Sequence, residues 1–293
     1  MPELVRIEDY HIPQTVEETL ELLAAETKRG REVALLAGGT DILVRMREGR
    51  MQPRVIIQIE ALDELRGITE TETSLRIGAR VTFAELLASP LIERHARVIS
   101  LACFEIGAPQ IQSRGTVGGQ LGTASPVGDL IPPLLVLDAE VLCRSVDDER
   151  RIPIGDFVKG VGKNDLRPDE LILGVEFPKP PPGAHGLWHK MGPRRAQSIS
   201  KVSFAGLVHL DKRKRVALCR LAYGAVAVTA IRARETEALL TSQALTPALI
   251  REAQALVQTE FSPITDLRST ESYRRKMCGV MLRRGLSGLL EQG

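Results

Sequence analysis

The stretch from residue 106 to residue 137 carries the residues best suited to hold a ligand, because it is dense in glycine and almost free of charge. Glycine destabilises the interior of a helix or a strand, so this density argues against both. Within it, Thr116-Val117-Gly118-Gly119-Gln120 is expected to offer successive peptide N–H groups with little side-chain bulk in the way. Such a row of donors suits a pyrophosphate or a similar anion, so the stretch is predicted to be a nucleotide-cofactor loop.

Asp129 follows this loop, at the entry to an apolar run whose first turn carries Pro132 and Pro133. Two roles for its carboxylate are open at this point. It can cap the helix that the apolar run predicts, or it can accept hydrogen bonds from a sugar hydroxyl of the nucleotide.

A second glycine turn lies earlier in the chain. The apolar run 33–37 is predicted to be a buried strand, and it leads directly into Gly38-Gly39-Thr40-Asp41 and then into a helical pattern over 42–48. A strand, a glycine turn and a helix start together aim backbone N–H groups at an anion. The alternative is a tight turn in which Thr40 caps the helix. Two such loops in one domain favour the ligand.

A third candidate is the stretch 188–196, which brings Lys190, Arg194 and Arg195 close together. Lysine and arginine are common on protein surfaces, so a surface loop is one reading. The functional reading is that Lys190 or an arginine reaches back to the cofactor side of the first domain.

Composition excludes several classes of function. The 293 residues hold 39 basic and 37 acidic side chains, a net charge of +2 that gives no field for nucleic acid or an anionic membrane. No apolar run is long enough to span a bilayer, and the first ten residues lack a signal-peptide pattern. A cytoplasmic globular protein of about two domains is therefore expected.

The cysteines and histidines predict no metal site. Cys103, Cys143, Cys219 and Cys278 lie far apart in apolar segments, whereas zinc and iron–sulfur sites use closely spaced ligands. Four reduced thiols in the core are expected. The histidines at 185 and 189 flank a glycine and are typical of a strand.

The elements that position these residues follow from capping boxes and periodicity. Thr15 and Thr82 each precede a glutamate by three residues, which predicts a helix start at both. Helices are expected over 15–30, 42–48, 91–105, 229–240, 247–257 and 271–289, and strands over 33–37, 55–59, 74–78, 139–145, 150–154, 171–177, 201–210 and 216–226. Short elements alternate without a regular βαβ rhythm, which indicates an α+β fold.

Three further segments are interpreted from their composition. The proline-rich connector 178–183 predicts a domain boundary, because proline disfavours helix and central strand. The basic run 211–215 is interpreted as a solvated hairpin tip rather than a nucleic-acid site. Gly160-Val161-Gly162 is set aside as a dinucleotide motif, because no strand and helix flank it as such a motif requires.

With these residues collected, the chain resembles the FAD-binding (medium) subunit of the molybdenum hydroxylases, the xanthine dehydrogenase and aerobic carbon monoxide dehydrogenase family. The resemblance covers essentially the full length and is specific, because five motifs occur in order. They are LAGGTDI (36–42), RGTVGGQLGTASPVGDL (114–130), LRPDELILGVEFP (166–178), KMGPRRAQSISKV (190–202) and PITDLRSTESYRR (263–275).

The resemblance implies a fold and a set of site residues. It implies a p-cresol methylhydroxylase-like FAD-binding domain over 1–177, made of two α+β subdomains with a boundary near 60, and a C-terminal sheet-plus-helices domain over 184–293. FAD would be held by two glycine loops, an anchoring aspartate, a serine, two apolar residues beside the ring system and a flavin-side lysine. Those residues are Leu36, Ala37, Gly38, Gly39, Thr40, Asp41, Ile42, Ile106, Thr116, Val117, Gly118, Gly119, Gln120, Ser125, Asp129, Ile172 and Lys190. Gln120 departs from the family, which commonly has Asn or Asp there.

The resemblance also implies a division of labour between subunits. The molybdenum cofactor and two [2Fe–2S] clusters would belong to a molybdopterin-binding large subunit and a small subunit, and this chain would carry only FAD, with no catalytic acid, base or metal ligand of its own. Electrons would pass to NAD, a quinone or oxygen. Two alternatives remain open, a stand-alone FAD-dependent oxidase or reductase acting on a small substrate, and a scaffold subunit that has lost FAD.

Overall fold

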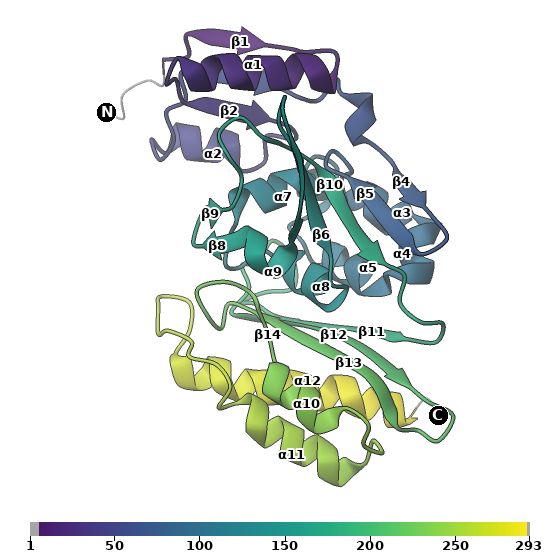
Figure 1. Ribbon diagram of the computed structural model, residues 1–293. Coiled ribbons are helices and arrows are strands. Elements are labelled where there is room, and N and C mark those ends of the chain that lie inside the picture. The colour runs from purple at the N-terminus through teal and green to yellow at the C-terminus, as the bar shows by residue number, and fades with distance from the viewer. Residues whose placement is uncertain (1–5, 292–293) are drawn as a thin grey trace.

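The computed structural model describes residues 6–291, and its three larger sheets are stacked along the molecule, with a small two-stranded sheet of β8 (Val158–Gly160) and β9 (Lys163–Asn164) beside them (Figure 1). The expected domain ends at residues 1–5 and 292–293 lie outside the described part. Helices and strands are mixed throughout, which confirms the predicted α+β class.

The amino-terminal layer is a parallel sheet in the order β1-β3-β2, formed by β1 (Asp9–His11), β3 (Val55–Gln58) and β2 (Val33–Leu36). Helix α1 (Val16–Lys28) begins as predicted, since the Thr15 hydroxyl accepts the N–H of Glu18. Helix α2 (Ile42–Arg47) follows β2 after the glycine turn, and none of its residues is buried.

The central layer is an antiparallel sheet in the order β4-β5-β10-β6-β7. Its strands are β4 (Ile68–Glu70), β5 (Ser74–Gly78), β10 (Leu171–Pro178), β6 (Glu140–Arg144) and β7 (Glu149–Pro153). Helix α3 (Phe83–Ala88) starts at the predicted capping box of Thr82 and Glu85. The prediction of a single helix over 91–105 is wrong. The segment forms two helices, α4 (Pro90–His95) and α5 (Arg97–Phe104), because Ala96 takes a φ of −145° that ends the first.

Short elements connect this sheet to the rest of the chain. They are η1 (Asp63–Leu65), α6 (Pro109–Gln112), α7 (Val117–Thr123), α8 (Ile131–Val136), α9 (Ile154–Phe157), β8 (Val158–Gly160) and β9 (Lys163–Asn164). All six residues of α8 are buried, and this helix leads from the glycine-rich stretch into the core.

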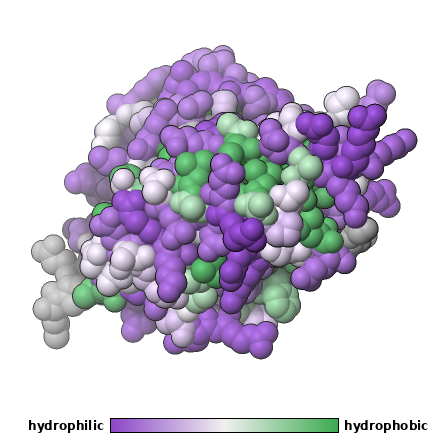
Figure 2. Space-filling view, turned by 90° about the horizontal axis from the view of Figure 1, so that it is seen from below, coloured by the Kyte–Doolittle hydropathy of each residue, from purple (hydrophilic) through white to green (hydrophobic). Residues whose placement is uncertain are grey.

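The carboxyl-terminal layer is an antiparallel sheet in the order β11-β12-β13-β14, formed by β11 (His185–Met191), β12 (Val202–Leu210), β13 (Val216–Gly224) and β14 (Ile231–Arg232). Helices α10 (Arg234–Leu240), α11 (Pro247–Val257) and α12 (Glu271–Glu291) cover the face turned away from the central layer (Figure 1). The helix expected from residue 229 begins only at Arg234, since β14 occupies the residues before it. Figure 2 shows the molecule from this helical side, with a small hydrophobic area among mostly hydrophilic residues.

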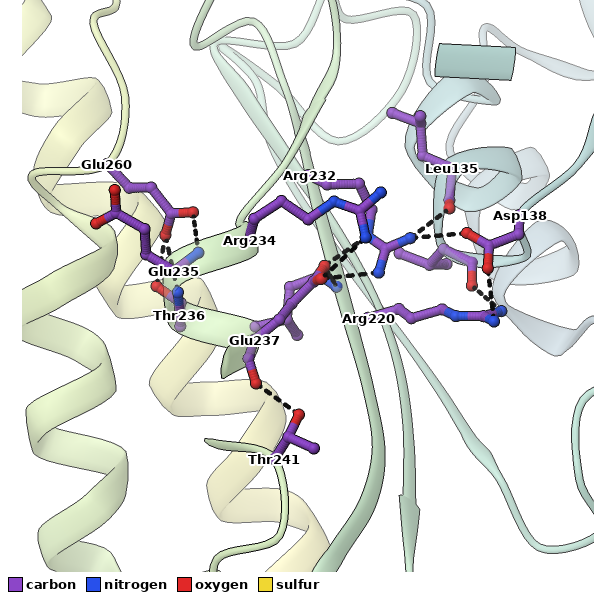
Figure 3. Close-up of polar contacts among 12 residues, drawn as sticks. Leu135, Asp138, Arg220, Arg232, Arg234, Glu235, Thr236, Glu237, Thr241 and Glu260 are labelled. Atoms are coloured by element: carbon purple, nitrogen blue, oxygen red, sulfur yellow. Dashed lines mark hydrogen bonds and ion pairs between the residues drawn. The ribbon is translucent and has the colours of Figure 1, made fainter. Parts of the chain in front are cut away.

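A network of charges joins the central layer to the carboxyl-terminal one (Figure 3). Asp138, just after α8, forms ion pairs with Arg220 and with Arg232. Nη1 of Arg232 lies 2.8 Å from the Asp138 carboxylate. Arg232 also pairs with Glu237 of α10. The two arginines donate in addition to the carbonyl groups of Leu135 and Val136, which are acceptors left over at the end of α8.

The cysteines, the histidines and the basic run 211–215 lie where the sequence predicted them. All four cysteines are buried and unbonded, which confirms the predicted core thiols. His185 and His189 lie in β11, and the run 211–215 forms the turn between β12 and β13, as predicted. Among residues 6–291 no group of histidine, cysteine, aspartate or glutamate side chains is arranged to hold a metal ion, and no helix is long and apolar enough to cross a membrane.

Candidate cofactor site

The two predicted glycine loops lie against each other. Gly39 has a φ of +74°, which turns the chain from β2 into α2. A Cβ atom at Gly38 would collide with the carbonyl oxygen of Arg114, so the backbones of the two loops touch at this point. The contact continues where Thr123 of α7 donates to the carboxylate of Asp41 at 3.3 Å.

The second loop differs from its prediction, since residues 117–123 form helix α7. Thr116 caps it by accepting the N–H of Gly119 at 3.1 Å. Gly118 leaves no room for a side chain, because the helix packs closely on the residue that follows β5: a Cβ at Gly118 would lie 2.8 Å from that of Ala79. Gly118 and Gly119 thus lie inside a helix, which the glycine content of the stretch had argued against.

The prediction that Thr116 to Gln120 offer a row of free N–H donors is also wrong. The N–H of Val117 donates to the carbonyl of Val81, that of Gly118 to the carbonyl of Ala79, and that of Gln120 to the carbonyl of Thr116. Together with the capping bond, these contacts use every backbone donor from Val117 to Gln120 within the protein.

The first turn keeps the donors that the second lacks. The N–H groups from Gly38 to Asp41 have no hydrogen-bond acceptor within residues 6–291. Asp41, not Thr40, stands at the start of α2, and its side chain makes no capping bond but pairs with Arg45 at 2.7 Å. Beside it, Leu43 and Val44 of α2 are 53% and 47% exposed. The turn thus presents peptide donors next to an apolar surface.

Gln120 adds a polar atom that needs a partner. Its Oε1 is buried and has no hydrogen-bond partner within the described chain. Its Nε2 lies against Gly128, one residue before Asp129. The hydroxyl of Ser125 accepts the N–H of Val127 at 3.4 Å in the same segment. A ligand that brings hydrogen-bond donors and acceptors to the Gln120 side chain and the Ser125 hydroxyl would satisfy both. The residues present therefore fit a nucleotide cofactor.

Lys190 reaches the first domain, as one reading of the sequence predicted. Its ammonium lies 2.7 Å from an oxygen of Asp129 and donates to the carbonyl of Glu105 at 2.8 Å. The Ser200 hydroxyl donates to the other oxygen of Asp129 at 2.5 Å. The side chains of Lys190 and Asp129 are only 3% and 8% exposed. Arg194, by contrast, donates to the carbonyls of Ala196 and Gln197 in its own loop.

The structure excludes one of the two roles that the sequence left open for Asp129. Leu130 stands at the start of α8, and that helix has no side-chain cap, so the capping role is wrong. Burial raises the pKa of the Asp129 carboxyl above its ordinary value, and the charge of Lys190 and the hydroxyl of Ser200 act in the opposite direction.

The two apolar residues assigned to the ring system are buried in the core of the central layer. Ile106 follows α5 and Ile172 lies in β10, where the pairing with β6 shifts register. The turn before Ile106 is held by Gln112, whose Nε2 donates to the carbonyls of Cys103 and Ile106.

Sequence reasoning missed Ser200 and the backbone of Glu105. Ser200 is fully buried and lies 71 residues from Asp129, so no local spacing connects them. Its presence ten residues after Lys190, within one of the five motifs, is the signal that could have drawn attention to it.

Comparison with known proteins identifies the fold that this site belongs to. The family model of the FAD binding domain in molybdopterin dehydrogenase matches residues 5–180, and the model of the carbon monoxide dehydrogenase flavoprotein C-terminal domain matches residues 188–289. The chain belongs to this family. FAD is therefore its cofactor, and the protein is an oxidoreductase subunit.

Curated relatives match over nearly their whole length. The putative xanthine dehydrogenase FAD-binding subunit XdhB of Escherichia coli K12 is 32% identical over 280 residues, which cover 95% of this chain and 94% of the relative. The carbon monoxide dehydrogenase medium chain of Hydrogenophaga pseudoflava is 27% identical over 95% of this chain and 96% of the relative.

A solved structure extends the likeness to three dimensions. A chain of the Hydrogenophaga pseudoflava carbon monoxide dehydrogenase that lacks the Mo-pyranopterin moiety has a TM-score of 0.92 and 28% identity, covering 100% of this chain and 99% of its own. The chain is thus an FAD subunit of the kind found in multisubunit molybdenum hydroxylases.

Proposed function

We propose that this chain is the electron-transfer station of such a complex, receiving electrons from the [2Fe–2S] clusters of a small subunit and passing them to NAD, a quinone or oxygen. A molybdopterin-binding large subunit would oxidise the substrate. One observation carries the proposal: the FAD domain and the flavoprotein C-terminal domain lie in one chain that spans 94% of a relative named as an FAD-binding subunit.

The first glycine turn is proposed to bind the diphosphate of FAD. Its peptide groups from Gly38 to Asp41 have no acceptor within residues 6–291, and a diphosphate would supply acceptors. The second loop contributes shape rather than donors, because its N–H groups from Val117 to Gln120 are used within the protein and the carbonyl of Arg114 lies against Gly38. Gln120 is proposed to accept a hydrogen bond from the cofactor at its buried Oε1.

Asp129 and Lys190 are proposed to act as a unit at the flavin side of the site. Asp129 already pairs with the ammonium of Lys190. The main task of Asp129 is therefore to hold that ammonium in place rather than to anchor a sugar. Ile106 and Ile172 are proposed to border the ring system. When bound, FAD supplies the redox chemistry, exchanging electrons between a one-electron cluster and its acceptor, while the protein fixes its position and its electrostatic surroundings.

The proposal is tested by expressing the chain with the reading frames that flank it and purifying the product. We expect three chains to copurify, with molybdenum, iron and released FAD. Release of FMN alone would contradict the cofactor assignment. Turnover of a small substrate by the isolated chain, with no other subunit, would instead support the stand-alone oxidase or reductase and overturn the proposal.

A further inference from the structure

Strand β11 is an edge of the carboxyl-terminal sheet. Within the described chain it pairs only with β12, over the seven residues from His185 to Met191. In an antiparallel pair, the peptide groups of alternate residues point away from the partner strand. One edge of β11 therefore carries N–H and C=O groups that are available to another strand.

Helices α5 and α12 cover the two faces of β11. The open edge of the strand therefore lies at the bottom of a groove between these helices. On one face α5 packs so closely that a Cβ at Gly186 would lie 2.8 Å from the nitrogen of Val98. On the other face α12 approaches, and a Cβ at Gly285 would lie 3.2 Å from Leu187. A cavity of about 1100 Å³ lies between them, lined by α4, α5, β11, α12 and the proline-rich connector.

The groove continues along β11 towards the candidate cofactor site. A second cavity of about 440 Å³ shares Trp188 and His189 with the first and extends to Lys190. Phe104, at the end of α5, lines it and is 74% exposed. The open edge thus runs from the connector to the lysine that pairs with Asp129.

Basic side chains outnumber acidic ones around the larger cavity. Arg94, Arg97, Lys179 and Arg284 line it, against Glu72 and Glu93. Arg97 pairs with Glu93, and Lys179 pairs with Glu70. Arg94 and Arg284 form no ion pair with another residue of the range 6–291. An acidic occupant would complement this charge.

We propose that the groove binds an extended acidic segment of a partner subunit, which adds to the sheet as a fifth strand beside β11. The open backbone edge selects an extended chain, and the apolar lining residues, among them Leu101 and Leu289, take its alternate side chains. Arg94 and Arg284, which form no ion pair within residues 6–291, take its carboxylates. This assignment rests on the proposed function in one respect only, namely that the chain works in a complex. It adds a specific surface by which the partner is held near Lys190.

Hydrogen exchange measures strand addition directly. Amide exchange across residues 185–191 is compared between the isolated chain and the purified complex. We expect protection of alternate amides in the complex only, because a new strand bonds every second residue. Trp188, the one tryptophan of the chain, lines the groove and gives a second readout, since its fluorescence should change on assembly.

Charge reversal tests the choice of an acidic partner. The double variant Arg94→Glu with Arg284→Glu should weaken assembly by about tenfold or more. Its control is Arg251→Glu with Lys276→Glu, which makes the same change of net charge at exposed positions of α11 and α12. The control should assemble like the unmodified chain.

The outcomes separate this assignment from the proposed function. A complex that contains the metals but leaves the β11 amides exchanging freely would overturn the groove assignment alone. Protection that grows with the concentration of the isolated chain would show that a second copy occupies the edge, and would overturn it too. Failure of any complex to form would overturn both.

Discussion

The ammonium of Lys190 lies 2.7 Å from the carboxylate of Asp129, and the pair joins two parts of the chain that are 61 residues apart. Lys190 belongs to β11, whereas Asp129 precedes α8. A buried pair of this kind adds little net stability as a unit, but breaking it leaves one charge uncompensated. Loss of either partner should therefore be costly.

Lys190→Met should lower the free energy of unfolding by about 3–5 kcal/mol, since it leaves the carboxylate of Asp129 buried without its counter-ion. Urea denaturation measures this change. Adding Asp129→Asn removes the uncompensated charge and should restore part of the loss. Arg194→Met, in an exposed loop, is the matched control. A double variant no more stable than the single one would show that packing, not charge, sets the cost.

Gly38→Ala should abolish retention of FAD, because the new methyl group would collide with the carbonyl of Arg114 and push the two loops apart. The ratio of flavin absorbance to protein absorbance measures retention. Gly122→Ala is the control, since a Cβ there meets nothing within 4 Å. That control lies in α7 and should stabilise the fold by about 0.5–1 kcal/mol. Full flavination of Gly38→Ala would remove the first turn from the site.

Gly119→Val should reduce flavin retention by disturbing the first turn of α7. A side chain there would meet the Thr116 hydroxyl, with its Cβ 2.9 Å away, and displace the cap of α7. We expect partial loss of flavin with the fold kept, measured by absorbance and by circular dichroism. Unchanged flavin content would show that the cap can be lost without disturbing the site.

Asp138→Asn should destabilise the contact between the layers by about 1–3 kcal/mol, because it removes the charge that Arg220 and Arg232 share. Asparagine suits the φ of +50° at this position, so the substitution isolates the charge from backbone strain. Thermal unfolding measures the change. An effect no larger than that of a distant surface substitution would assign the contact to α8 packing alone.

His189 should make stability depend on pH in a defined direction. Burial, and secondarily the charge of Arg284, lowers the pKa of His189 below its ordinary value of 6.5. Its protonated form is thus less favourable in the folded than in the unfolded chain. As pH falls below 6.5, the unfolded chain takes up the proton first, and stability decreases. Denaturation on either side of this pH should show the loss, and His189→Gln should reduce it.

The four thiols should resist a disulfide reagent in the folded protein. Burial raises the pKa of Cys143, Cys219 and Cys278 each to about 12, and that of Cys103 further still. Because the thiolate is the reactive form, labelling at neutral pH should be slow until the chain unfolds, when four thiols react. Rapid labelling of any one in the native state would contradict this packing.

The sequence predicted the local signals well. The caps at Thr15 and Thr82, the hairpin of β6 and β7, and the pair β12 and β13 all follow from short-range patterns. Helix α7 was missed because its stability is not local: its first turn bonds to the carbonyls of Ala79 and Val81, and Gly118 is needed for the close approach to Ala79.

In the candidate site, too, local features were predictable from the sequence and contacts between distant residues were not. Its glycine turn was predictable, because the strand, the turn and the helix start are contiguous in the chain. The bond from Ser200 to Asp129 and the open donors of the first turn were not, since they depend on which distant backbone groups the fold brings into reach. Resemblance to a family supplied the order of the motifs, but not which donors are already used.

Strand β12 serves two hydrophobic cores at once. Ala205 and Leu207 pack into the core of the central layer, while Phe204 and Val208 pack into that of α10–α12. The two matched family domains therefore share a wall. Cutting the chain at the proline-rich connector would leave each half with an apolar surface that the other normally covers, so neither half should melt as an independent unit. Two domains in the sequence would then behave as one cooperative body.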